Sequence, residues 1–272
     1  MNIIKQIAKG LTLAGLLFIL HNPLSIAQDL QGKSMPINIG QYNERPPVNE
    51  GTIADGRRIY DRACIYCHGK DGTGKGPVAF FLSRDTGPHP RDFTLGPYKF
   101  RSTESGEPPL DEDLFRTITR GIVGYMPGFV GLDSPDRWKL VYYIKSLAPA
   151  DFEGVQPEPI KVVGSPVPLT AMSVQRGYEL YQLAGCWECH GGSGRGNGEK
   201  APELKDDNGM LLPPANLTMP NSFKAGSRPE DLYRTLLTGL DGGAMPSHDR
   251  FKGHEEDVWD LVNYVRSLAV TK

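Results

Sequence analysis

Two short runs hold all four cysteines of the chain, and both have the spacing C-x-x-C-H. The first is Cys64-Ile65-Tyr66-Cys67-His68, and the second is Cys186-Trp187-Glu188-Cys189-His190. If each run coils into a helix, positions i, i+3 and i+4 share one face. The two cysteines can then form thioethers to a haem while the histidine reaches its iron. Each run therefore predicts the covalent attachment of one haem c group.

Other interpretations of the cysteines are a zinc knuckle, disulfides among the four thiols, or chance spacing. A zinc site would need a second Cys or His pair close to each run, and neither run has one. The duplication of the whole run, which leaves no cysteine over, favours haem attachment.

A Met-Pro pair follows each haem-attachment run at a corresponding place, as Tyr125-Met126-Pro127-Gly128 and Ala244-Met245-Pro246-Ser247. A thioether sulfur is a soft, weak iron ligand, and His/Met ligation raises the reduction potential of a haem. A lone methionine usually fills a core. The repetition favours Met126 and Met245 as iron ligands, opposite His68 and His190.

Three further histidines could compete for the iron. His248 lies three residues after Met245 and is the most serious rival, whereas His89 and His254 stand elsewhere. We interpret all three as surface or structural histidines.

Repeated helices are predicted around these residues. The last helix of each copy spans 138–148 or 259–269, a constant offset of 121 residues. Ahead of each haem run, a glycine and a tyrosine stand one turn apart, where the glycine would let the last helix approach closely. These pairs are Gly56 with Tyr60 and Gly177 with Tyr181.

A third repeated helix is predicted at 113–121 and 231–239, and both copies end at glycine. Ser227 and Glu230 have the spacing of a capping box at the start of the second copy.

Repeated loops at 90–94 and 214–218 should line the haem edge. Arg91 could neutralise a haem propionate or be an exposed arginine, and the second copy has alanine there. The carbonyls of Pro77 and Pro202 are the expected acceptors for the second ring N–H of His68 and His190.

The amino terminus predicts export. Lys5 and Lys9 precede an apolar run from Leu11 to Leu20, and small residues follow at 25–27, so residues 1–27 have the pattern of a signal peptide. An uncleaved anchor is the alternative. The mature chain would carry 28 basic and 32 acidic side chains, without the basic stripe expected of a nucleic-acid-binding protein.

The predicted organisation is all-α. An extended segment at 28–50 precedes a first domain at 51–148, a proline-rich linker at 149–170 and a second domain at 171–272. Residues 51–150 carry a net charge of +2 and residues 171–272 of −3, a difference that could orient docking.

Each unit resembles a class I cytochrome c domain of the kind found in dihaem cytochromes c and in the dihaem subunit of cbb3-type oxidases. This resemblance implies helices wrapped on haem. It covers about 51–148 and 171–270. The residues that carry it are Gly56, Tyr60, Cys64, Cys67, His68, Met126, Leu140 and Tyr143, and Gly177, Tyr181, Cys186, Cys189, His190, Met245, Leu261 and Tyr264.

We therefore expect a periplasmic electron-transfer protein, not an enzyme, that passes single electrons between redox proteins. It would act as a soluble shuttle or as a subunit of a larger oxidoreductase, with membrane association only through partners or an uncleaved signal segment. The alternative is a dihaem peroxidase, which needs a displaceable iron ligand with acid-base groups beside it. A gas sensor is a third possibility, but no signalling domain is recognisable.

Overall fold

The structure is a computed structural model that describes residues 45–82, 89–96, 98–164 and 166–269. Within these ranges the regular elements are helices, and β pairing is limited to three isolated bridges. The predicted all-α fold is confirmed. The expected signal peptide lies outside the described residues, as does most of the expected segment at 28–50.

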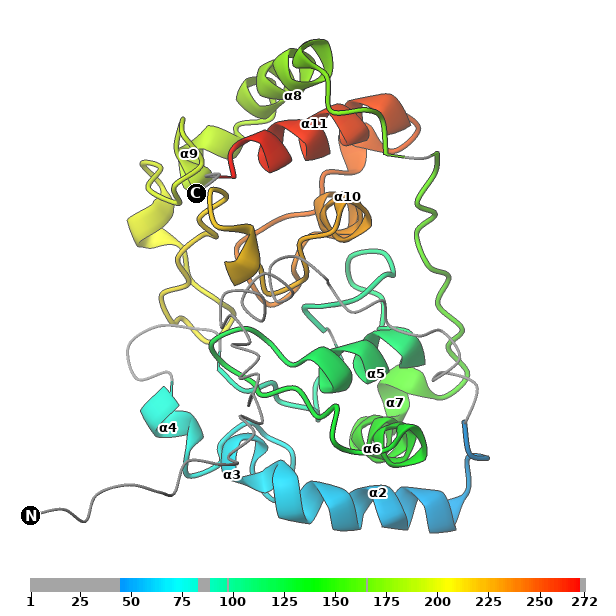
Figure 1. Cartoon of the computed structure of the whole chain (residues 1–272). Coiled ribbons are helices and arrows are strands. Elements are labelled where there is room, and N and C mark those ends of the chain that lie inside the picture. The colour runs from blue at the N-terminus through cyan, green and yellow to red at the C-terminus, as the bar shows by residue number, and fades with distance from the viewer. Residues whose placement is uncertain (1–44, 83–88, 97, 165, 270–272) are drawn as a thin grey trace, which may run out of the picture. The chain divides into compact units, whose positions relative to one another are not determined.

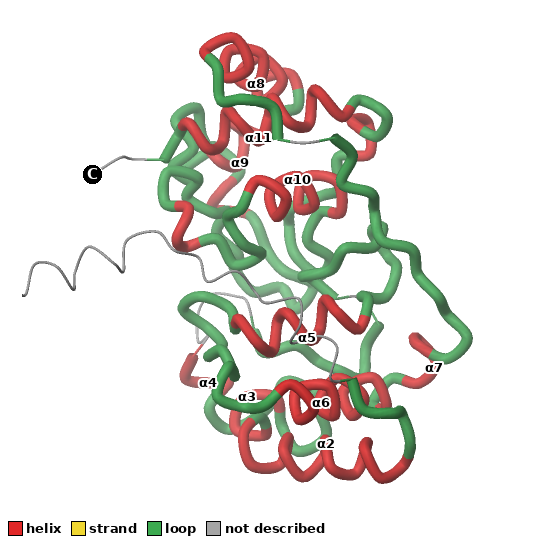
Figure 2. The backbone as a smooth tube through the Cα atoms, turned by 45° about the vertical axis from the view of Figure 1, so that its right-hand side comes forward, coloured by secondary structure: helices red, strands yellow, loops and turns green. Residues whose placement is uncertain are grey.

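The first half is built on α2 (Glu50–Ala63) and α6 (Ser134–Ser146), which lie against each other (Figures 1 and 2). A reciprocal capping box between Asn49 and Thr52 starts α2, and the Asp133 side chain caps α6. The other helices of this half are α3 (Ile65–His68), α4 (Ala79–Leu82), α5 (Asp111–Arg120) and α7 (Pro149–Phe152).

The crossing of α2 and α6 depends on Gly56. A Cβ atom at this position would overlap the backbone carbonyl oxygen of Lys139, so a larger residue would force the helices apart. One turn later, Tyr60 is fully buried, and its hydroxyl donates a 2.7 Å hydrogen bond to the carbonyl oxygen of Gly69. Because Gly69 directly follows His68, the predicted glycine-tyrosine pair holds the haem-attachment run against the crossing.

The second half repeats this arrangement with α8 (Ala171–Leu183) and α11 (Glu255–Ser267). One extra residue separates Tyr181 from the haem run, and Gly185, with a φ of 72°, accommodates it in a left-handed turn before α9 (Cys186–His190). The other elements are α10 (Pro229–Thr238) and the 3-10 helices η2 (Ala201–Glu203), η3 (Pro220–Ser222) and η4 (Asp249–Phe251).

The third repeated helix packs an aromatic ring on the tryptophan of the last helix in each half. The Phe115 and Trp138 ring centroids are 4.3 Å apart, and those of Tyr233 and Trp259 are 4.7 Å apart. The predicted capping box at Ser227 is wrong, because Arg228 is the N-cap residue of α10 and no side chain caps that helix.

The segment before α2 is fastened to the last helix of the first half. The Arg45 guanidinium lies 4.3 Å from the centroid of the Trp138 ring and also pairs with Asp111 at the start of α5. The Tyr142 hydroxyl donates a 2.8 Å hydrogen bond to the Pro46 carbonyl oxygen. This contact between the amino-terminal segment and α6 buries the face of the tryptophan.

Residues of the predicted linker make equivalent contacts with α11. The indole N–H of Trp259 donates to the Val163 carbonyl oxygen at 2.9 Å, and the Asn263 amide donates to that of Val167 at 3.1 Å. Earlier in the linker, Ile160 donates a backbone hydrogen bond of 2.7 Å to the first half. The linker is therefore hydrogen-bonded to both halves.

The described residues from 45 to 269 form one compact unit. Among the described residues, no helix combines the length and the apolar composition that crossing a bilayer requires.

Candidate functional site

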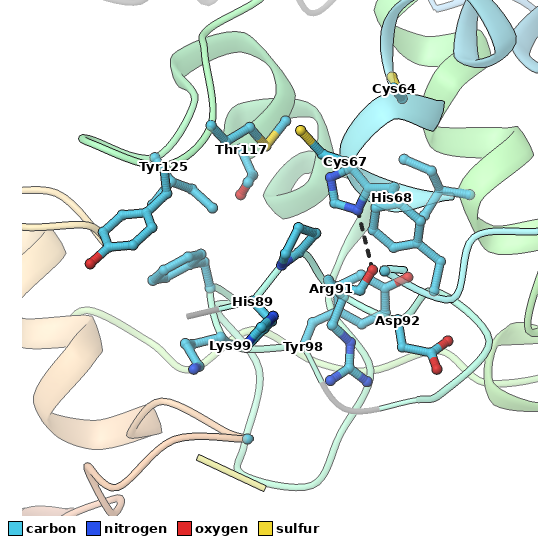
Figure 3. Close-up of a pocket in the computed structure, with 18 of the residues that line it drawn as sticks. Cys64, Cys67, His68, His89, Arg91, Asp92, Tyr98, Lys99, Thr117 and Tyr125 are labelled. Atoms are coloured by element: carbon cyan, nitrogen blue, oxygen red, sulfur yellow. Dashed lines mark hydrogen bonds between the residues drawn. The ribbon is translucent and has the colours of Figure 1, made fainter. Parts of the chain in front are cut away.

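Each C-x-x-C-H run lies on a short helix that ends at its histidine, as the spacing predicts. The Nδ1 atom of His68 donates to the Arg91 carbonyl oxygen at 3.2 Å, and that of His190 donates to the Ala215 carbonyl oxygen at 3.0 Å (Figure 3 shows the first bond). Because a carbonyl only accepts, Nδ1 carries the proton in both rings, and Nε2 is left to bind iron. Burial lowers the pKa of both histidines, which favours the neutral form.

These acceptors overturn the prediction of Pro77 and Pro202. Both observed acceptors belong to the repeated loop that starts at Pro90 or at Pro214. Two residues past each acceptor, the loop donates a backbone hydrogen bond, of 2.7 Å in the first half and 2.6 Å in the second, to the glycine turn after the haem run. This main-chain anchoring places the carbonyl beside the imidazole whatever the side chain, so arginine and alanine serve equally.

A cavity of about 660 Å³ lies beside the first haem-attachment run (Figure 3). Its wall includes Cys64, Cys67, His68 and Met126, so the structure brings the four predicted site residues of the first half together. The Phe93 ring stacks on the His68 imidazole, with ring centroids 4.4 Å apart. Cofactor pockets range from roughly 300 to 1,000 Å³, so the cavity has the size that a bound cofactor needs.

Three buried polar atoms on this wall have no hydrogen-bond partner among the described residues: His89 Nε2, Arg91 Nε and the Tyr98 hydroxyl. Burial lowers the pKa of Arg91 and of Lys99 on the same wall. Unpartnered buried polar groups are rare and costly, and they point to an absent polar ligand. The carboxylates of a haem would satisfy them, so the chemistry of the cavity fits this group.

Arg91 is half-buried, contrary to its interpretation as an exposed arginine. Its guanidinium lies 5.2 Å from the Tyr98 ring centroid and donates a 2.7 Å hydrogen bond to the Leu95 carbonyl oxygen. Tyr98 and Lys99 belong to no repeated motif, so no pattern in the sequence pointed to them.

Part of the second half also lines the first cavity. Asp206, Asp207, Asp241 and Gly242 lie on its wall. No sequence signal identified these residues, because none of them belongs to a repeated motif.

In the second half, the haem run and the predicted methionine pack against the same core. Cys186 and Met245 are both partly buried against the cluster that contains Tyr181, Leu236 and Trp259. Two of the four predicted site residues of the second half therefore share one core, while His190 is held separately through its Nδ1 hydrogen bond.

The structure places the three competing histidines differently. His248 lies beside the second core, because its backbone N–H donates a 3.0 Å hydrogen bond to the carbonyl oxygen of Leu236. His89 lines the first cavity, and His254 is exposed just before α11.

None of the four cysteines forms a disulfide. Burial raises the pKa of Cys64 to about 12 and that of Cys186 to about 11, so both thiols stay protonated at neutral pH. Within the described ranges, no group of three or more His, Cys, Asp or Glu side chains could hold a metal ion. The structure therefore does not support the zinc and disulfide interpretations.

Each methionine ends a loop that begins just after the third repeated helix. In the first methionine loop (122–126), the Ile122 N–H donates to the Met126 carbonyl oxygen at 2.8 Å. In the second methionine loop (240–245), the Leu240 N–H donates to that of Met245 at 3.0 Å. The second loop contains one residue more.

Two protein-family models match separate parts of the chain. Residues 51–144 match the family described as cytochrome c oxidase, cbb3-type, subunit III, and residues 174–269 match the family described as cytochrome c.

Known proteins resemble the chain across both halves. A chain of the reducing HAO-like protein complex of Kuenenia stuttgartiensis is 38% identical, with a TM-score of 0.74, and the match covers 84% of this chain and all of that one. The cytochrome bc1 complex cytochrome c subunit of Corynebacterium efficiens is 24% identical over 239 residues, or 82% of this chain. The chain spans 65% of the length of that subunit.

Proposed function

Because this chain belongs to the dihaem c-type cytochromes and carries two covalently attached haem c groups, we propose that it passes single electrons between proteins as a subunit of a redox complex. One observation carries this proposal. In both domains the histidine of the haem run donates from Nδ1 to a backbone carbonyl, and a methionine loop follows the third repeated helix.

The proposed iron ligands are His68 and Met126 in the first domain and His190 and Met245 in the second. Haem iron supplies a one-electron couple, whose potential depends on its axial ligands. The carbonyls beside each histidine orient the imidazole and raise its basicity. If Met126 and Met245 hold the iron, they would leave no free site on it for peroxide, so this arrangement suits electron transfer better than peroxide chemistry. His248 remains the alternative ligand in the second domain.

The proposed partner is a larger oxidoreductase rather than a succession of freely diffusing proteins. Support comes from the names of the two relatives, one from an HAO-like protein complex and one from a cytochrome bc1 complex. The proposed location is outside the cytoplasm, where the signal-peptide pattern at 1–27 would direct the chain.

The haem content and redox chemistry of the purified protein test the electron-transfer role. We expect about two covalent haems per chain and reversible one-electron reduction at each. A Cys189→Ser variant should retain the first haem fully. A different haem stoichiometry, or rapid turnover of hydrogen peroxide by the half-reduced protein, would contradict the proposal and in the second case favour the peroxidase.

Purification of the native protein without a tag tests the subunit role. We expect the chain to co-elute with a larger redox enzyme through two successive columns and at moderate salt. Recovery only as a free monomer at both low and moderate salt would favour the soluble shuttle instead.

A further inference from the structure

The second methionine loop is held less by its own backbone than the first. The first loop closes with three internal hydrogen bonds, because Ile122 donates to Met126 while Tyr125 and Met126 both donate to Ile122. The second closes with two, from Leu240 to Met245 and from Gly243 to Leu240, each 3.0 Å long. A longer loop with fewer internal bonds needs support from elsewhere to hold one conformation.

The first domain supplies that support. The Asp241 carboxylate, inside the second methionine loop, accepts 2.8 Å hydrogen bonds from the Ser105 hydroxyl and the Gly106 N–H. It also pairs with Arg101 at 2.9 Å. A second hydrogen bond from Arg101, 2.8 Å long, reaches the carbonyl oxygen of Thr238, the last residue of α10.

The Arg101 side chain has no exposed surface. It donates to the carbonyl oxygens of Tyr98 at 3.1 Å and Glu104 at 2.9 Å, in addition to its contacts with the second domain. A buried guanidinium is tolerated only where its donors are satisfied. Its charge also lies at the carboxyl end of α10, where a cation is favourable.

The same residues face the first cavity. Tyr98 and Asp241 both lie on the cavity wall, and Met245 follows Asp241 by four residues. Arg101 therefore connects the wall of the first haem site with the loop that carries the proposed ligand of the second.

Two ion pairs between the domains do not involve this loop. Lys252 pairs with Glu104 at the surface, and Arg120 lies 3.8 Å from Asp231 at the start of α10. These pairs join the domains without touching residues 240–245, so they provide controls for a general loosening of the domain contact.

We infer that Arg101 is a positioning residue for the second methionine loop, so that iron binding by Met245 depends on a side chain of the first domain. This inference rests on the proposed function, because it takes Met245 as the iron ligand. With the loop held, the Met245 sulfur would stay on the iron and exclude other ligands. Without Arg101 the loop opens more often, and external ligands compete for the iron.

The experiment uses the haem-loaded protein in a Met126→His background, where the ferric sulfur-to-iron absorption reports Met245 alone. In this background we expect Arg101→Met to lose most of the absorption and to bind imidazole about tenfold more tightly, since a charged hydrogen bond is lost. Asp241→Asn, a milder change, should shift both readouts in the same direction by a smaller amount. Lys252→Met should leave both unchanged.

Unchanged absorption and imidazole affinity in Asp241→Asn and Arg101→Met would overturn the inference. An equal loss in Lys252→Met would also overturn it, because any loosening of the domains would then suffice. If Arg101→Met does not yield haem-loaded protein, Asp241→Asn decides by the same criteria. If the Met126→His parent lacks the absorption, Met245 is not the iron ligand. This outcome contradicts the ligand assignment and differs from the outcomes that overturn the role of Arg101.

Discussion

The two domains hold an equivalent carboxylate with different partners. Asp113, at the start of α5, accepts hydrogen bonds from the hydroxyl and backbone N–H of Ser102 at 2.8 and 2.7 Å. Asp231, at the same place in α10, is paired instead with Arg228 at 3.1 Å and with Arg120 at 3.8 Å. Both carboxylates also pair with an arginine three residues later. One helix start is therefore held largely by neutral groups and the other by charge.

A similar difference separates the paired helices. In the first domain, Lys139 on α6 makes partly exposed ion pairs with Asp136 and Asp55. In the second domain, the corresponding residue is the buried Asp260, which accepts hydrogen bonds from Ser173 and Arg176. The two domains therefore share the backbone geometry around the haem runs, but they differ in the polar contacts that stabilise it.

The largest effect should come from a feature that the domains share. Gly56→Ala and Gly177→Ala should each destabilise the protein by about 3 kcal/mol, because the new methyl group would overlap a backbone carbonyl oxygen on the opposing helix. Urea unfolding of the haem-loaded protein measures this. Gly131→Ala and Gly192→Ala, where space is open, should change stability by less than about 0.5 kcal/mol. Clearly unequal effects at the two crossing glycines would show that the helix pairs are not equivalent.

The next prediction separates the two haems. Met126→His and Met245→His should keep the covalent haem but lower the potential of the haem in the altered domain, on the order of 0.1 V, because imidazole is the stronger donor. Spectroelectrochemical titration would resolve the two potentials. If Met245→His left both potentials and the sulfur-to-iron absorption unchanged, His248 would be the ligand in the second domain.

A smaller difference, in the free energy of unfolding, is expected between variants of the two helix pairs. Asp260→Ala should cost about 2 kcal/mol, since it leaves the buried Ser173 hydroxyl without an acceptor for its proton while the half-exposed Arg176 regains water. Lys139→Met should cost less than about 1 kcal/mol, and this cost should vanish in 1 M salt. Urea unfolding at two salt concentrations tests both. Equal costs would contradict the contrast between a buried contact and a surface one.

The smallest effect is a pH dependence at α10. Burial alone would raise the pKa of Asp231, but its arginine partners outweigh burial and lower the pKa. A carboxylate with a lowered pKa stabilises the fold above its unfolded value and loses that contribution as the pH falls through the folded value. Asp231→Asn should therefore cost roughly 1–2 kcal/mol at pH 7 and progressively less below about pH 4. Unfolding of both proteins at pH 7 and pH 3 measures the change, and a constant difference would contradict it.

Duplication explains what the sequence could predict. Thioether attachment and iron ligation demand particular residue types at fixed spacing, so Cys64, Cys67 and His68 were recognisable with their second copy. Gly56 and Gly177 were predictable for a steric reason, because close helix crossing excludes a side chain at the same place in both units.

The remaining features depend on contacts between distant parts of the chain. Pro77 and Pro202 were plausible acceptors from their position, but the path of the backbone decides which carbonyl reaches an imidazole. Arg101 and Tyr98 belong to no repeat, and their roles come from packing between the two domains. Such contacts leave no repeated or periodic pattern in the sequence.

Each of the two tryptophans contacts residues that precede the first helix of its domain. These contacts determine where a single domain can be cut from the chain. A fragment of the second domain cut at Ala171 would lose the acceptors at Val163 and Val167, leaving the Trp259 indole N–H without its acceptor and the Asn263 amide with Ser173 alone. A fragment of the first domain that starts at α2 would lose the Arg45 guanidinium from the Trp138 ring. Autonomous folding of either domain therefore requires several residues upstream of its first helix, beyond the ends that the haem motifs would suggest.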